Sequence, residues 1–139
     1  MFDGETKVHL LDWSSTKIHR KVKSTLAAEA AGASRGYDRV TYCRALIAEL
    51  EFGSRQGHWT KNAAKIPCGI ATDCRSLYDL CNNLVGLPDE RRVALDLLDV
   101  KEGLEENQDQ IRWVPTEHML ANGLTKKMPP DFLLAFLKE

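Results

Sequence analysis

The sequence lacks the features of a membrane-embedded or secreted protein. No apolar run approaches the roughly 20 residues that a membrane-spanning helix needs, and the first residues, MFDGETK, do not resemble a secretion signal. The four cysteines, Cys43, Cys68, Cys74 and Cys81, are irregularly spaced and form no Cys-x-x-Cys pair. We therefore expect an intracellular protein, in the cytoplasm or the nucleus, with reduced thiols and without a membrane partner.

The sequence also lacks internal repeats, low-complexity stretches and a strong net charge. Its 139 residues suit one domain over residues 1–139, and the net charge is −1. That small value conceals an asymmetry, because residues 1–65 carry 11 Lys+Arg and 7 Asp+Glu, whereas residues 66–139 carry 8 and 13. Positive charge concentrates in Lys17, Arg20, Lys21 and Lys23, a stretch able to contact nucleic-acid phosphates. On composition alone, a solvated loop is the simpler interpretation.

Strand-like and helix-like patterns alternate along the chain, which predicts an α/β layered fold with some parallel strand pairing. In chain order, the expected elements are a strand at residues 6–14, a long helix from the Ser24-Thr25 cap to Gly53, a loop at 54–64, a strand at 66–73, a helix at 76–84, a helix with Pro88 in its first turn, a strand at 111–114 and a final helix from Pro129-Pro130.

Apolar spacing also predicts which helix faces are buried. One stripe is expected in the helix after Pro88, on Val93, Leu97, Val100 and Leu104. The other is expected in the long helix, on Leu26, Ala30, Ala33, Tyr37, Val40, Ile47 and Leu50, with a local break near Gly32 and Gly36 because each glycine disfavours the helix by about 1 kcal/mol.

Two acidic residues are candidates for metal binding. Glu29 lies among four alanines on the apolar side of the long helix, where a carboxylate projecting from a packed seam needs a partner such as a metal ion. An exposed position on the helix edge is the simpler alternative. Asp73 ends a strand, and ligands of open α/β sheets gather outside the carboxyl ends of strands. Asp73 is equally suited to cap the following helix, and the two roles are compatible.

Three weaker candidates follow from residue type alone. Glu117 and His118 come just after the last strand, where a histidine can move protons, although surface positions explain them as well. A zinc site built from cysteines and a histidine fits no usual ligand spacing.

Four segments together resemble the ribonuclease H domain of copia-type retrotransposon polyproteins, and the resemblance covers nearly the whole chain. They are DWSSTKIHRKVKSTLAAEA (12–30), ATDCRSL (71–77), RRVALDLLDVKEGL (91–104) and RWVPTEHMLANGLTKKMP (112–129). The last segment is the most specific, with its Trp-Val-Pro-Thr and Leu-Thr-Lys parts. In the third, Ala94 replaces the family's usual histidine.

This resemblance implies a ribonuclease H-like fold, a mixed five-stranded sheet with helices on both faces. It places the family's catalytic glutamate on Glu29, a catalytic aspartate on Asp73, and Asn122 at the position of the last catalytic aspartate. The implied activity is hydrolysis of the RNA strand of an RNA–DNA hybrid with Mg²⁺ or Mn²⁺, for which Glu29 and Asp73 would be the metal ligands. Lys17, Arg20, Lys21 and Lys23 would hold the nucleic-acid backbone, and a reverse transcriptase domain would belong to the same polyprotein.

Two departures from the family pattern lower the expected activity. Only twelve residues precede Trp13, so we expect the first strand and its catalytic aspartate to be missing, since neither Asp3 nor Asp12 matches that motif. Strands would then pair in an altered sheet or recruit a strand from another chain. Asn122 carries no charge, which weakens binding of hard cations. The alternative is a non-catalytic ribonuclease H-like module that binds nucleic acid or protein. An integrase-type nuclease is disfavoured by Leu-Thr-Lys.

Overall fold

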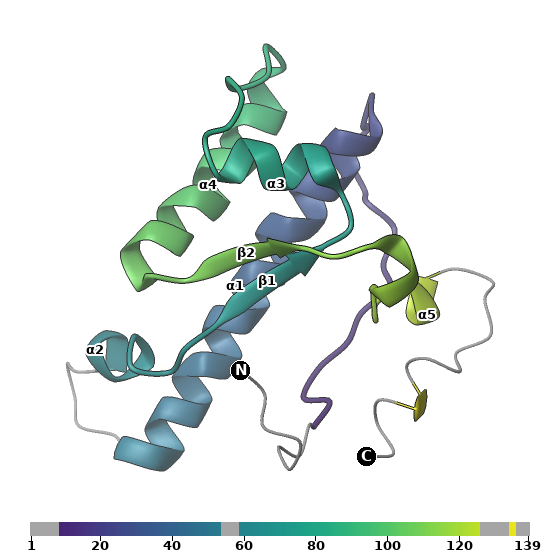
Figure 1. Cartoon of the computed structure of the whole chain (residues 1–139). Coiled ribbons are helices and arrows are strands. Elements are labelled where there is room, and N and C mark those ends of the chain that lie inside the picture. The colour runs from purple at the N-terminus through teal and green to yellow at the C-terminus, as the bar shows by residue number, and fades with distance from the viewer. Residues whose placement is uncertain (1–8, 54–58, 126–133, 136–139) are drawn as a thin grey trace. The chain divides into compact units, whose positions relative to one another are not determined.

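The computed structural model describes residues 9–53, 59–125 and 134–135 of the chain (Figure 1). Two compact units are present: the larger unit, formed by Ile18–Trp113, and the flanking unit, formed by the segments on either side of it. The elements of the larger unit are α1 (Thr25–Phe52), α2 (Trp59–Ala63), β1 (Gly69–Thr72), α3 (Arg75–Cys81), α4 (Arg91–Asn107) and β2 (Gln110–Trp113). The flanking unit holds the short 3-10 helix η1 (Thr116–His118) and α5 (Asn122–Thr125). None of the described helices has both the length and the apolar character needed to cross a membrane.

Helix α1 begins and ends where the sequence predicts. The Ser24 hydroxyl accepts a hydrogen bond from the Ala27 amide at 3.1 Å, which satisfies one of the unpaired donors of the first turn. Gly53 ends the helix with φ 78°, a left-handed value that glycine adopts without a steric penalty. The break predicted near Gly32 and Gly36 is absent, because α1 is continuous and packs its small residues against α4.

The described strands form a two-stranded parallel sheet in which Ile70 pairs with Ile111. Ile111 is buried and Ile70 half-buried, whereas Gly69, Ala71 and Gln110 on the opposite face are exposed. The α/β class and the parallel pairing are therefore confirmed. The mixed sheet with helices on both faces and the ribonuclease H-like topology stay predictions.

Several local predictions are wrong at the level of single elements. Residues 9–14 form no strand, and residues 1–8 lie outside the described part. Residues 59–63 form α2 instead of a loop. Helix α4 starts at Arg91 with Glu90 as its N-cap, three residues beyond Pro88. Most of the predicted final helix, including Pro129-Pro130, lies outside the described residues.

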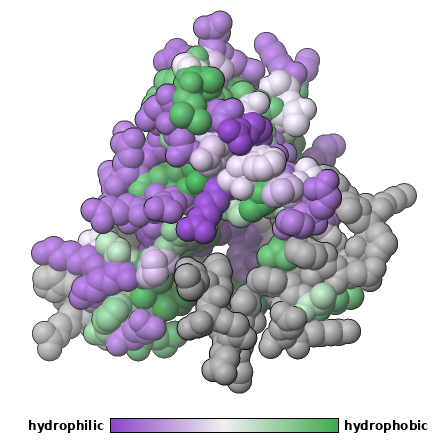
Figure 2. Space-filling model, in the orientation of Figure 1, coloured by the Kyte–Doolittle hydropathy of each residue, from purple (hydrophilic) through white to green (hydrophobic). Residues whose placement is uncertain are grey.

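The core lies where α1 and α4 pack on each other and on one face of the sheet. All four residues of the predicted α4 stripe are buried, with Leu97 and Val100 fully enclosed. The α1 side of the core consists mainly of alanines, because small side chains let α4 approach closely. The predicted α1 stripe is wrong at its end, where Leu50 is 86% exposed. In the view of Figure 2, the described apolar residues form separate groups within a largely hydrophilic surface.

The closest approach of α1 and α4 is at Tyr37 and Gly103. A Cβ atom on Gly103 would lie 2.2 Å from Tyr37 Cε1, so only glycine fits beneath the ring. The Tyr37 hydroxyl lies 2.7 Å from both the Gly103 carbonyl oxygen and Asp109 Oδ2, and its single proton serves one acceptor at a time. Asn107 Nδ2 donates to the same hydroxyl at 3.2 Å. Tyr37 therefore joins α1 to both the end of α4 and the residue that precedes β2.

Arg44 of α1 and Asp109 form a buried ion pair next to Tyr37. Their side chains are 3% and 2% exposed. Burial opposes the guanidinium charge, but the hydrogen bond to Asp109 and the neighbouring Cys68 outweigh it and raise the pKa of Arg44. Arg44 Nε and Nη1 have no hydrogen-bond partner among the described residues. Removing either charge would leave the other buried and unpaired, at a cost of about 3–5 kcal/mol.

We predict opposite effects of alanine at two helical glycines. Gly103→Ala should lower the free energy of unfolding by about 1–3 kcal/mol, because the new methyl group overlaps the Tyr37 ring. Gly36→Ala should raise it by about 0.5–1 kcal/mol, because its Cβ meets no atom within 4 Å and alanine favours a helix. Urea denaturation followed by circular dichroism measures both. Equal effects would contradict the close approach.

We also predict that the stabilisation provided by Tyr37 is lost at alkaline pH. Burial and the hydrogen bond to Asp109 raise the pKa of its phenol from 10.0 to about 12. The unfolded chain thus loses this proton first, and the stabilisation present below about pH 10 is lost as the pH rises towards 12. Tyr37→Phe should cost about 1.5–3 kcal/mol at pH 8, and this difference from wild type should shrink above pH 10. A difference that is constant with pH would contradict the prediction.

Candidate functional site

The carboxyl end of β1 carries Asp73, as the sequence predicts. Asp73 is half-buried and precedes α3, whose N-cap residue is Cys74 and not Asp73. The capping role predicted for Asp73 is therefore wrong. The turn between β1 and α3 is instead closed by the Thr72 hydroxyl, which accepts a hydrogen bond from the Cys74 amide at 3.1 Å. The carbonyl oxygen of Asp73 accepts the Trp113 Nε1–H bond at 3.2 Å, which links the ends of the two strands.

Glu29 lies in the second turn of α1. It is half-buried beside the buried alanines Ala27 and Ala30. In Figure 1, α1 and α4 run in the same direction, opposite to β1 and β2. The first turns of α1 and the carboxyl end of β1 therefore lie towards one end of the unit.

The described residues do not by themselves form a metal centre. They contain no group of three or more His, Cys, Asp or Glu side chains placed to hold an ion. Glu29 and Asp73 offer the oxygen ligands that Mg²⁺ prefers, but two carboxylates are fewer than the family's set. All four cysteines are free, and no described group supports the zinc alternative.

Asn122 belongs to the flanking unit and makes a hydrogen bond that an ionised aspartate cannot make. It is the first residue of α5, is 8% exposed, and donates from Nδ2 to the Thr116 carbonyl oxygen at 2.8 Å. A carboxylate has no proton to donate and would be repelled by that carbonyl. The amide thus closes the turn between η1 and α5. Glu117 and His118 in η1 are both exposed.

The four basic residues of the predicted nucleic-acid contact have different surroundings. Arg20 is half-buried and forms an ion pair with Asp96 of α4, so part of its charge is neutralised within the fold. Lys21 and Lys23, which precede α1, are exposed. Lys17 is exposed as well and belongs to the flanking unit. Of these four residues, Lys21 and Lys23 are therefore the two in the larger unit whose charges are exposed to phosphates.

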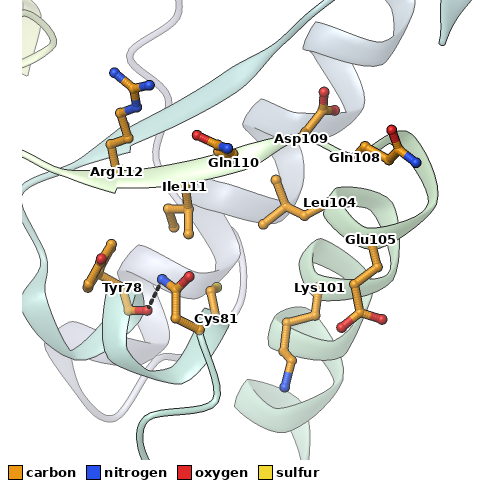
Figure 3. Close-up of a pocket in the computed structure, with 11 residues that line it drawn as sticks. Tyr78, Cys81, Lys101, Leu104, Glu105, Gln108, Asp109, Gln110, Ile111 and Arg112 are labelled. Atoms are coloured by element: carbon orange, nitrogen blue, oxygen red, sulfur yellow. Dashed lines mark hydrogen bonds between the residues drawn. The ribbon is translucent and has the colours of Figure 1, made fainter.

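A cleft of about 570 Å³ lies between α3, α4 and β2 (Figure 3). Leu104, Ile111 and Cys81 form its apolar part, and polar or charged side chains surround it. Burial raises the pKa of the Cys81 thiol, with the charge of Lys101 acting in the opposite direction. The thiol is thus held in its protonated form, which is a poor nucleophile. The Lys101 ammonium donates to Asn83 Oδ1.

An arrangement that the sequence did not predict lies beside Asp73. Arg75 and Tyr78 of α3 and Trp113 of β2 form what we call the Arg–aromatic platform. The Arg75 guanidinium carbon lies 5.2 Å from the centre of the Tyr78 ring and 5.6 Å from that of Trp113. The i, i+3 spacing of Arg75 and Tyr78 indicates a shared helix face. Only the pairing of the strands brings Trp113 to that face.

Comparisons with known proteins add no assignment: no protein-family model, curated protein or solved structure matches the chain.

We predict that Asn122→Asp lowers stability. The substitution removes the donor to Thr116 and buries a carboxylate against a carbonyl oxygen, which should cost about 1–3 kcal/mol at pH 7. Asn122→Ala loses the same hydrogen bond without adding charge. At low pH the new carboxyl is protonated and can donate to Thr116, so Asn122→Asp should approach wild type and become more stable than Asn122→Ala. Thermal unfolding at pH 7 and pH 4 measures this. Wild-type stability of Asn122→Asp at pH 7 would contradict the role given to the amide.

Proposed function

We propose that the chain is a ribonuclease H-like domain of a copia-type retroelement polyprotein that binds RNA–DNA hybrids. The observation that supports it best is the placement of Glu29 and Asp73. Glu29 lies in the second turn of α1 and Asp73 directly follows β1. The start of α1 and the carboxyl end of β1 lie towards the same end of the parallel strand pair (Figure 1).

The proposed contact with the nucleic-acid backbone uses the exposed lysines before α1. Lys21 and Lys23 lie a few residues from the N-terminus of α1, and Glu29 is one turn further along. Lysine side chains at such a place bind phosphates through charge, without selecting a sequence. Arg20 would contribute less, because Asp96 already holds its guanidinium.

The proposed activity is hydrolysis of the RNA strand, reduced in this chain. Glu29 and Asp73 would be the ligands of Mg²⁺ or Mn²⁺, and the neutral Asn122 adds no charge. Because hard cations depend on carboxylate charge for their affinity, we expect weak metal binding and little or no cleavage by this chain alone. A reverse transcriptase domain of the same polyprotein is the proposed partner.

The second candidate function is a non-catalytic ribonuclease H-like module. The Asn122–Thr116 hydrogen bond favours it, because there the amide has a structural role that excludes an aspartate. The two candidates share nucleic-acid binding and differ in whether any metal-dependent cleavage remains.

We predict measurable binding of a labelled RNA–DNA hybrid that decreases with salt. Lys21→Gln combined with Lys23→Gln should reduce the slope of log affinity against log salt by about 1 for each lysine. The matched control removes two exposed charges elsewhere, with Arg35→Gln and Lys61→Gln. Fluorescence anisotropy over a range of salt concentrations measures both pairs.

The same samples test cleavage. Cleavage should be weak or absent in Mg²⁺ and, if present, should be abolished by Asp73→Asn. Absence of hybrid binding by the wild-type chain would overturn the proposed function. Strong cleavage that depends on Asp73 would instead overturn the expectation of reduced activity and exclude the non-catalytic module.

A further inference from the structure

Three side chains beside Asp73 form a surface suited to a flat ligand. In the Arg–aromatic platform, Trp113 is 41% exposed and the Arg75 side chain is 61% exposed. The Trp113 indole is oriented by its Nε1–H bond to the Asp73 carbonyl oxygen. Arg75 is oriented by its Nε–H bond to Asp79 Oδ1 at 3.1 Å, one helical turn further along α3. The platform is thus held in position before any ligand arrives.

We propose that the Arg–aromatic platform stacks an unpaired base of a nucleic-acid strand that lies next to Asp73. This proposal rests on the proposed function, which it deepens by naming the contact for single-stranded segments. Tryptophan, tyrosine and the arginine plane are the side chains on which unstacked bases lie in single-strand recognition.

The surrounding charges favour a base over a phosphate as the bound group. Asp79 accepts a hydrogen bond from Arg75, so one carboxylate lies against the guanidinium. It repels a phosphate and reduces the charge that Arg75 can offer it. A base ring is neutral and is not repelled in this way.

Base stacking and phosphate binding differ in their dependence on salt. Contacts of Lys21 and Lys23 with phosphates weaken as salt rises, because counterions compete with them. Stacking of a neutral base on the platform releases no counterions, so its contribution to the binding affinity should be equal at low and high salt. The two parts of the proposed interface can therefore be measured separately in the same chain.

The test compares the full chain with Trp113→Ala on two ligands, a labelled oligothymidine and an abasic oligonucleotide of equal length. The variant should bind oligothymidine about 5- to 150-fold more weakly and the abasic ligand with wild-type affinity, at both low and high salt. Trp113→Phe should retain most of the affinity because it keeps a ring. Trp13→Ala is the matched control, since Trp13 is 61% exposed in the flanking unit.

Arg75→Ala keeps the indole and its hydrogen bond, so it tests the platform even where Trp113→Ala unfolds. It should weaken oligothymidine binding in the same direction. The platform proposal would be overturned if Arg75→Ala and a folded Trp113→Ala bind oligothymidine as the wild type does. It would also be overturned if the variants lose affinity equally for both ligands. The proposed function would stand in either case if the wild-type chain still binds the hybrid. A wild-type chain that binds no nucleic acid would overturn both proposals.

Discussion

The buried contacts of Asp109 with α1 support most of the larger unit. Tyr37 and Arg44, two turns apart on α1, both bond to Asp109, which follows α4 and directly precedes β2. These bonds set where the chain leaves α4 and in which direction β2 begins. The register of β2 against β1 then brings Trp113 next to Thr72 and so to Asp73. The arrangement at the carboxyl end of the sheet thus depends on an ion pair at its opposite end.

Burying the Arg44–Asp109 ion pair costs free energy, which close packing around the pair offsets. A buried Arg–Asp pair loses much of its hydration, and two Arg44 nitrogens find no partner within the described chain. The absence of a side chain on Gly103 lets Tyr37 lie against α4 and donate into the same cluster. The pair therefore contributes position and register more than net stability.

Lineage and chemistry are separate questions in this chain. The proposed carboxylates are Glu29 of α1 and Asp73, which follows β1, and the described residues contain no cluster of three metal ligands. Asn122 instead uses its amide to close a turn, which is a structural use of a position that the resemblance assigns to catalysis. The Arg–aromatic platform lies beside Asp73 and needs no metal.

The sequence alone determined the elements that depend on local interactions. Ser24 and Gly53 predicted both ends of α1, because caps act within one turn, and the 3–4 spacing predicted the buried stripe of α4. It also placed Asp73 at a strand end. Only the tertiary structure decided which strand faces are covered, that Asp109 is buried against Arg44, and that Trp113 meets Arg75. These contacts join residues far apart in the chain, and no local periodicity specifies which distant partner satisfies a buried charge or covers an aromatic ring.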